Sequence, residues 1–359
     1  MPSTSKDPIL VVLQLTGGND YLNTVIPYTN PLYRDYRPVV GIPEDKVLPL
    51  DDTAAFHPAM GLMKPIYERG DMAIIHGVGY PHAPRSHFRS MDIWHTCEPH
   101  KLGTEGWLGR ATRDIDPHKE NVLTTVSFGP ALFRALTLPG VSEQRQRSRI
   151  LQWFAHMYSP AVGSGAVMDY LGQTGLDTLQ GADILKDAPK RYASTVKYPE
   201  TPIAKKLKGI AQVHMAHFGT RIFYCDHGSF DSHSNQHGMH DKLWKDVSEG
   251  VACFFDDLQE HGVGDNVIML MFSEFGRRTR DNGSGTDHGS GGVAFVLGER
   301  VKGGQYSEFP SMKNEDLEQG DVVPNHDFRG LYSTILEDWM GLDAKPLVGG
   351  TFEKLAYLS

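Results

Sequence analysis

Five short apolar runs constrain the fold of this 359-residue chain more than any other feature. Each run is rich in Val, Ile, Leu or Met and lacks the polar alternation of a half-exposed strand, which is typical of buried parallel strands. Parallel strands must be joined by crossover connections, usually helices. The pattern therefore predicts an α/β fold with a mostly parallel central sheet. The runs cover residues 9–15, 72–78, 221–225, 267–272 and 293–297.

Helical patterns lie between these runs. Apolar residues recur at helical spacing between residues 240 and 262, with Gly262 as a stop signal, which predicts a helix and a right-handed βαβ crossover. Residues 142–220 are predicted to be mostly helical, with 148–158 and 204–218 the clearest segments. We therefore expect a single domain over residues 1–359, with residues 142–220 as a helical insertion or cap.

Composition excludes some classes of protein. A net charge of −9 and a pI near 6.0 argue against nucleic-acid binding through a basic face. The three cysteines are far apart and form no CxxC pair, so they predict neither a disulfide framework nor a thiolate zinc site. The first apolar run is too short for a signal peptide or a membrane span. The sequence as it stands predicts a cytoplasmic protein; a periplasmic location requires a preceding leader.

Acidic and imidazole side chains follow or precede several of the predicted strands. The densest cluster is "CDHGSFDSHSNQHGMHD" at residues 225–241. Ligands of open α/β sheets bind beyond the carboxyl ends of the strands, so these side chains are expected to meet there. Mixed carboxylate and imidazole ligands suit hard or borderline divalent ions. The predicted metal ligands are Asp20, Asp231, His233, Glu274, Asp287 and His288.

Structural roles compete with metal binding at some of these positions. Asp20 is equally well explained as a cap of the turn or of a following helix. Glu274 has Arg277 and Arg278 nearby as surface ion-pair partners. The other histidines of the cluster are better explained as solvated loop or helix-start residues; they are His227, His237 and His240.

Ser86 is the candidate nucleophile. It follows a Pro-rich loop and precedes a predicted helix that starts near His87. A serine at this position is most often an N-cap, but free N–H groups and the helix dipole there also favour an incoming anion. Arg85 and Arg89 are the expected holders of that anion, although arginines beside a helix start are also ordinary surface residues.

Seven segments together resemble a bacterial family known as domain of unknown function 1501. The resemblance runs from about residue 9 to residue 341, in the family's motif order. This family is grouped with the alkaline phosphatase and sulfatase superfamily of metal-dependent ester hydrolases and transferases. The matching segments are "LQLTGGNDYLNTVIPY", "FHPAM", "GVGYPHAPRSHFRSMDIW", "GWLGR", "GSFDSHSNQ", "FSEFGRR" and "GTDHGSGG".

The resemblance implies an alkaline phosphatase-like three-layer sandwich, with a mostly parallel central sheet and a helical insertion. It also implies that Asp20 is the first-strand metal ligand, that Ser86 is the nucleophile, and that His288 is the last metal histidine. Asp231 with His233 resembles another superfamily ligand pair. The superfamily's strand-ending Asp-His pair is replaced here by Glu274 and Phe275, and the loss of this imidazole makes either one ion or two compatible with the sequence.

The leading expectation is a hydrolase of phosphate or related sulfate or phosphonate esters, with one or two divalent ions (Zn, Mn, Mg or Ca) and a small anionic ester as substrate. Asn19, His87 and Arg277 are the expected substrate-binding residues. "CEPHK" at 97–101 has a lysine where the sulfatase motif needs arginine, which argues against a formylglycine sulfatase. The alternative is a catalytically degenerate protein that binds an anionic ligand or glycan. A serine esterase of the SGNH type, with Asn19 as oxyanion donor, lacks its Gly-Asp-Ser motif here.

Overall fold

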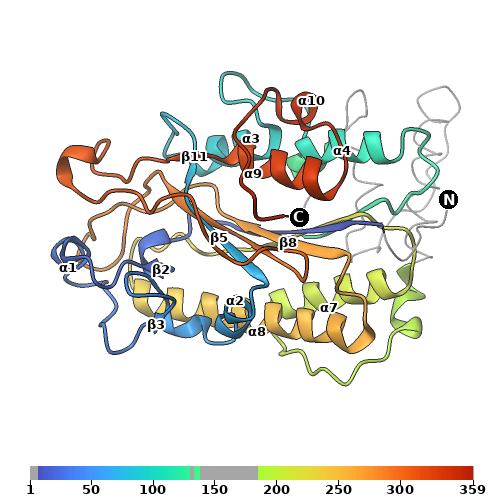
Figure 1. The fold of residues 1–359 in the computed structure, drawn as a ribbon, viewed down its shortest axis with the longest axis horizontal. Helices are drawn as coiled ribbons and strands as arrows, with labels where there is room; N and C mark the ends of the chain where they lie inside the picture. Colours follow the sequence, from blue (N-terminus) through green and yellow to red (C-terminus); the bar gives the residue numbers. More distant parts are fainter. Residues whose placement is uncertain (1–6, 130–132, 138–184, 359) are drawn as a thin grey trace, which may run out of the picture.

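The computed structural model describes residues 7–129, 133–137 and 185–358. A twisted central sheet lies between two layers of helices (Figure 1). This is the predicted α/β three-layer arrangement. The short β10 lies at one edge of the sheet and β6 at the other, and β11 pairs with β5 beside this path. In sheet order the strands are β10 (Gly304–Tyr306), β5 (Met72–Gly79), β9 (Gly292–Leu297), β8 (Val267–Phe272), β1 (Ile9–Leu15), β7 (Ile222–His227) and β6 (Thr125–Phe128), with β11 at His326–Asp327.

One strand runs against the others. β9 is antiparallel to both of its neighbours, β5 and β8, whereas the other pairings of this sheet among the described residues are parallel. The sheet is therefore mostly parallel, as predicted, but residues 293–297 are not the parallel strand that their apolar run indicated. An apolar run shows that both faces of a strand are buried and carries no information on its direction.

Alternate residues of β1 supply the two faces of the core. Val11 and Leu13 pack into one cluster, and Leu10 and Val12 into the other, because successive side chains of a strand point to opposite faces. The first cluster is covered by α2 (Lys64–Glu68), α7 (Pro202–Met215) and α8 (Gln236–His261). The second is covered by α3 (His87–Thr96), α4 (Trp107–Ile115), α9 (Phe328–Thr334) and α10 (Ala344–Val348). Figure 1 shows these two groups of helices above and below the sheet.

The helix after β7 confirms its sequence prediction. α8 ends at Gly262, which adopts the left-handed conformation (φ 64°) typical of a helix stop. The chain then enters β8, which is parallel to β7 with β1 between them, so α8 forms a crossover connection.

Part of the expected helical insertion, including residues 148–158, lies outside the described residues. The predicted segment 204–218 forms most of α7. This helix packs with α8 in the layer beneath the sheet.

A small antiparallel sheet and several short helical turns complete the described chain. Its strands are β2 (Val25–Ile26), β4 (Ala55–Phe56) and β3 (Leu48–Pro49), and α1 (Pro31–Tyr36) lies between β2 and β3 in sequence. The turns are the 3-10 helices Tyr21–Asn23, Pro58–Met60, Arg134–Leu136, Ala188–Arg191 and Asn314–Asp316, and the π-helix Ile335–Trp339. Among the described residues, no helix combines the length and the apolar character needed to span a bilayer.

Candidate metal centre

Several segments meet beyond the same edge of the sheet. The carboxyl ends of β1, β5, β7 and β8 lie there because these strands are parallel to one another, directly or through β9. β9 runs the other way, so the loop that precedes it also ends at this edge. This topology brings residues 16–20, 80–87, 228–235, 273–274 and 276–291 into one region.

Three imidazoles converge on one carboxylate in this region. The Nε2 atom of His288 lies 3.0 Å from Nε2 of His87 and 2.9 Å from Nε2 of His233. The same Nε2 atom lies 3.2 Å from Oδ1 of Asp231. The other two Nε2 atoms lie 3.1 Å (His233) and 3.4 Å (His87) from oxygens of this carboxylate. Donor atoms from His87, Asp231 and His288 all lie within 4.8 Å of one another.

Each of these imidazoles is held through its other nitrogen. The Nδ1 atom of His87 lies 2.8 Å from Oε1 of Glu274, and that of His233 lies 2.8 Å from Oδ1 of Asp287. The Nδ1 atom of His288 lies 2.9 Å from the main-chain oxygen of Arg85. An ionised carboxylate or a carbonyl oxygen can only accept, so each Nδ1 is the donor.

This hydrogen bonding has a direct consequence for the site. In neutral imidazoles with a proton on Nδ1, the Nε2 atoms carry lone pairs, and here they point toward one another and toward Asp231. Such a set is stabilised by a cation between the donors. Imidazoles that are oriented through Nδ1 by a carboxylate or carbonyl are the usual surroundings of a bound metal ion. The residues therefore fit a borderline divalent ion such as zinc, for which histidine and aspartate are ordinary ligands.

The structure changes the roles predicted for some residues. Glu274 and Asp287, predicted as ligands, lie behind His87 and His233 as their hydrogen-bond acceptors. His87, predicted to bind substrate, is one of the converging imidazoles. Nothing in the sequence around His87 has metal-ligand spacing; the only signal was its place beside the candidate nucleophile.

Asp20, which was predicted to be a metal ligand, does not lie among the converging imidazoles. Its carboxylate is fully buried and forms an ion pair with Arg37 (Nη1–Oδ2 2.6 Å), and Gln236 also donates to it. It does not cap the following 3-10 helix with its side chain. Burial raises the pKa of Asp20, but the charge and hydrogen bond of Arg37, together with His240 and Gln236, lower it, so the pKa lies below its ordinary value.

Asn19 and two of the other histidines are also structural. Asn19 is buried, and its Oδ1 accepts from Thr24 and from the Trp244 indole, so it does not face a substrate. His227 and His240 are buried as well, which corrects their prediction as solvated residues. His237 is exposed, as predicted, although its Nε2 contacts a main-chain oxygen.

Arg277 supports the centre from within the protein. Its side chain is fully buried, and Nη1 donates to Oδ1 of Asp231 at 2.8 Å. The predicted surface ion pair with Glu274 is not formed. Burial raises the pKa of Asp231, but the hydrogen bond and charge of Arg277, together with the charges of His233 and His87, lower it, so this carboxylate has a pKa below its ordinary value. Arg277 therefore positions Asp231 and favours its ionised form, rather than binding a substrate as predicted.

Two glycines allow the first loop to approach the site. Gly17 has φ +121°, and a Cβ there would lie 2.5 Å from the backbone nitrogen of Asp231. Gly18 has φ +73°, and its Cβ would lie 2.4 Å from the ring of Phe275. The Gly17 N–H donates to Glu274 at 3.0 Å. Only glycine tolerates both this conformation and this proximity.

Phe275 lies directly against the imidazoles. Its ring centroid is 4.9 Å from that of His87 and 5.1 Å from that of His288, and the residue is buried. The side chain that replaces the expected histidine is thus an apolar wall of the centre. It packs on two imidazoles and offers no ligand atom of its own.

Ser86 lies between two residues that are tied to this centre. Its neighbour Arg85 accepts from His288 through the main chain, and its other neighbour is His87. Ser86 is exposed and occupies the N-cap position of α3 with extended backbone angles, but its side chain makes no capping hydrogen bond. The structural role considered for this serine is therefore not realised, and the hydroxyl and the first N–H groups of α3 are left for a ligand.

The two predicted anion-binding arginines have other partners. Arg85 donates from Nε and Nη2 to Oδ2 of Asp321 at 2.9 and 2.5 Å. Arg89 pairs with Asp92 (2.5 Å) and donates to the main-chain oxygens that follow α3, at Glu98, Pro99 and Lys101. The structure does not bring either guanidinium to the imidazoles.

The electrostatics of His87 follow from its partners. The hydrogen bond to Glu274 raises the pKa of His87 above its ordinary value, while partial burial opposes this. For Asp287, the hydrogen bond from His233 lowers the pKa. The centre thus combines anionic carboxylates with imidazoles whose orientation is fixed, and it defines an α/β protein with a candidate metal site at the strand ends.

Comparison with known proteins gives the family. The sequence profile described as "Protein of unknown function (DUF1501)" matches residues 172–358, about half of the chain. The chain belongs to this family, which confirms the resemblance stated above. The sequence matches no curated protein.

Several solved structures are similar over most of the chain. One is a glycosaminoglycan-metabolism protein of Bacteroides thetaiotaomicron, with TM-score 0.48, 9% identity, and 98% of this chain and 77% of that chain covered. Another is the C-terminal periplasmic domain of EcEptC from Escherichia coli in complex with Zn, with TM-score 0.43, 10% identity, and 95% and 84% covered. A third is an alkaline phosphatase superfamily protein of Vibrio parahaemolyticus, with TM-score 0.40, 12% identity, and 97% and 70% covered.

Proposed function

We propose that this protein is a metal-dependent hydrolase of phosphate or related esters, with Ser86 as the nucleophile. The observation that carries the proposal is the position of Ser86: an exposed hydroxyl, not used as a helix cap, lies between two residues bonded into the imidazole centre. A nucleophile at a helix start beside a metal centre is an arrangement suited to an anionic ester.

His87, Asp231 and His288 would hold the ion, with the Nε2 atom of His233 beside that of His288. A divalent ion bound there would supply positive charge to the ester oxygens and lower the pKa of a coordinated hydroxyl. Glu274, Asp287 and the Arg85 carbonyl would keep the imidazoles oriented through their Nδ1 hydrogen bonds.

The chain's own groups account for the remaining steps. The free N–H groups at the start of α3 would donate hydrogen bonds to the anion, and the Ser86 oxygen would form a bond to phosphorus as the bond to the alcohol oxygen breaks. The departing alcohol oxygen takes up a proton, which balances the one that the serine hydroxyl gives up through solvent. Water then attacks the serine ester, releases phosphate and restores the hydroxyl.

Two measurements test this function together. Metal per chain is determined by elemental mass spectrometry on protein purified without a metal-binding tag. Turnover of aryl phosphate and aryl sulfate esters is then assayed with Zn, Mn, Mg and Ca added separately. Ser86→Ala should lower turnover by on the order of a thousandfold or more and leave the metal content unchanged. Ser234→Ala, an exposed serine of the loop after β7, is the matched control and should leave both unchanged.

One observation favours a second function. Phe275 occupies the place of an expected ligand and packs on two imidazoles, which suits a protein that binds an anionic ligand or glycan at this site without hydrolysing it. Metal-loaded protein that binds phosphate or sulfate but turns over none of the aryl esters supports this second function. Unchanged turnover in Ser86→Ala removes Ser86 from the mechanism.

A further inference from the structure

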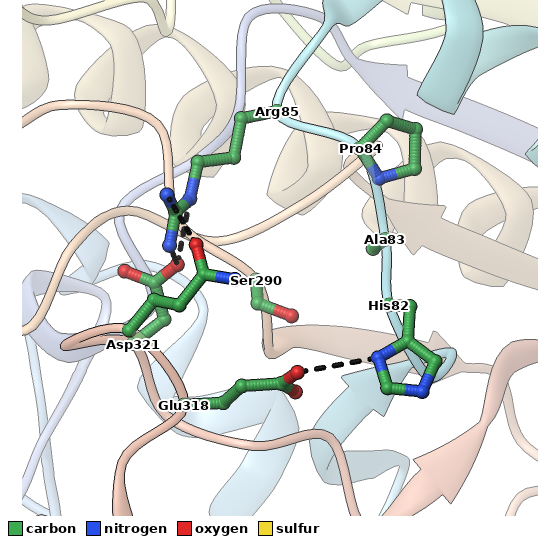
Figure 2. A pocket seen from close by; sticks show the side chains of 8 residues that line it. His82, Ala83, Pro84, Arg85, Ser290, Glu318 and Asp321 are labelled. Atoms are coloured by element: carbon green, nitrogen blue, oxygen red, sulfur yellow. Dashed lines mark hydrogen bonds and ion pairs between the residues drawn. The ribbon is translucent and has the colours of Figure 1, made fainter.

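A pocket adjoins the candidate metal centre. The pocket, of about 350 Å³, is lined by residues 82–85, by Glu318, Gln319 and Asp321, and by Ser290; Figure 2 shows these side chains around it. Two features connect it to the centre: Ser290 follows His288 by two positions, and the main-chain oxygen of Arg85, which lines the pocket, accepts from His288. Pockets of this size can hold a small ligand. A group that occupies it would lie beside the segment that carries Ser86.

One ion pair and one hydrogen bond run from one side of this pocket to the other. Arg85 pairs with Asp321 (2.5 Å), and His82 contacts Glu318 (3.2 Å), as the dashed lines of Figure 2 show. Charges of both signs therefore alternate along the wall. An anionic group on the ligand would be repelled by the carboxylates of Glu318 and Asp321. An ammonium group would be repelled by the guanidinium of Arg85. A neutral ligand with several hydrogen-bonding groups meets neither repulsion.

The wall also has unused capacity to accept hydrogen bonds. Asp321 is only 2% exposed, and its Oδ1 atom is buried without a partner among the described residues. Its pKa is raised by this burial, despite the pairing with Arg85. Glu318 contacts His82 through one oxygen only, and the Ser290 hydroxyl makes no hydrogen bond to another described residue. Buried acceptors are normally satisfied, so the Oδ1 atom of Asp321 lacks a partner that a ligand donor could supply. Glu318 is exposed and Ser290 is half-buried, so the donors of a ligand would replace solvent at these two groups.

We propose that this pocket binds the alcohol portion of the ester, and that this portion is an uncharged, hydroxyl-rich group such as a sugar or polyol. Its O–H groups would donate to Asp321, Glu318 and Ser290, while Ala83 and Pro84 face the C–H side of the ligand. The inference rests on the proposed function, because it takes the ester at Ser86 as the substrate.

The test uses an uncharged probe that needs no turnover. Binding of methyl α-glucoside to the metal-loaded protein is measured by ligand-observed NMR, in parallel with choline. The wild type should bind the glucoside saturably and more tightly than choline. Glu318→Ala and Asp321→Asn should weaken glucoside binding at least fivefold, after circular dichroism has shown that both variants are folded. Glu315→Ala, an exposed glutamate outside the pocket, should leave binding unchanged.

Turnover then separates the inference from the function on which it rests. In Glu318→Ala, kcat/KM for glucose 1-phosphate should fall at least tenfold, through KM, with little change for an aryl phosphate. Protein that hydrolyses the aryl phosphate but binds no glucoside, or binds it equally in Glu318→Ala and Asp321→Asn, overturns the inference alone. Protein that binds the glucoside in a Glu318-dependent manner but hydrolyses no ester overturns the proposed function and retains the ligand class. Tighter binding of choline than of the glucoside overturns the proposal that the group bound in this pocket is uncharged.

Discussion

The Nδ1 atom of His288 donates to the main-chain oxygen of Arg85 across 2.9 Å, although the two residues are 203 positions apart. This contact joins the loop before β9 to the residue that precedes Ser86. It also fixes the tautomer of His288 so that Nε2 faces His87 and Asp231. The orientation of the imidazole and the position of the nucleophile segment are therefore set by the same hydrogen bond.

Removal of His87 should remove metal rather than substrate affinity. We expect His87→Ala to weaken zinc binding by more than about tenfold, since loss of even an outer hydrogen-bond partner of a ligand costs about 10–100-fold. Zinc titration against a competing chelator measures this. His237→Ala, an exposed histidine of α8, is the control and should bind zinc like the wild type. Full zinc affinity in His87→Ala with a raised KM would return His87 to the substrate-binding role.

The buried pair of Asp20 and Arg37 should matter for stability and not for metal. Arg37→Met leaves an uncompensated buried carboxylate and should lower the free energy of unfolding by about 3–5 kcal/mol. Adding Asp20→Asn to that variant should restore part of the loss. Urea unfolding gives both values. The single variant Asp20→Asn should retain its metal; loss of metal in folded Asp20→Asn protein contradicts the assignment of Asp20 as structural.

Gly17 should not tolerate a side chain. A Cβ at this position meets backbone atoms of residues 230 and 231, which cannot rotate away. We expect Gly17→Ala to lower the free energy of unfolding by more than about 1 kcal/mol and to weaken metal binding through displacement of Asp231. Gly228→Ala is the matched control, since its Cβ would meet nothing within 4 Å. Equal stability and equal metal affinity of the two variants would contradict the close approach.

Stability should fall in mild acid because several histidines are buried in neutral form. Burial lowers the pKa of His95 to about 3, and that of His76 and of His214 to about 4, from 6.5. The unfolded chain then binds more protons than the folded one below pH 6.5. The free energy of unfolding is therefore highest above pH 6.5, and it falls as the pH drops from 6.5 toward the pKa that these histidines have in the folded protein. At pH 5.5 each such histidine costs about 1.4 kcal/mol relative to pH 7.5.

Urea midpoints at pH 7.5 and 5.5 measure this loss. His95→Gln should show a pH dependence smaller by about 1.4 kcal/mol, whereas His237→Gln should show the wild-type dependence. Equal midpoints of the wild type at the two pH values would contradict burial of neutral imidazoles.

The sheet and the region of the site could be predicted because both follow from simple patterns. Apolar runs without alternation indicate buried strands, and polar residues at their carboxyl ends must meet at one edge. Asp231, His233 and His288 were found in this way. The direction of β9 was not, since its apolar pattern is the same for either direction.

The division of roles within the site could not be predicted. Whether Asp20 or His87 reaches the centre depends on the backbone at Gly17 and Gly18 and on the distant partner Arg37, and none of these is visible in local spacing. Glu274 and Asp287 are residue types that bind metals, but here they contact the Nδ1 atoms of His87 and His233, on the side of each ring away from the converging Nε2 atoms. Only the folded structure distinguishes a carboxylate that faces the Nε2 atoms, such as Asp231, from one that orients an imidazole through Nδ1.

The reversed direction of β9 has a consequence for how the centre can assemble during folding. β9 lies between β5 and β8 in the sheet. His288 belongs to the segment that leads into β9, and His87 lies in the segment that follows β5. The two imidazoles come together only after a strand from late in the chain has inserted between two that precede it. Contacts of such long sequence separation form slowly. Ion binding at this centre should therefore report completion of the whole sheet, and a partly synthesised chain that stops before β9 cannot hold the ion in the same way.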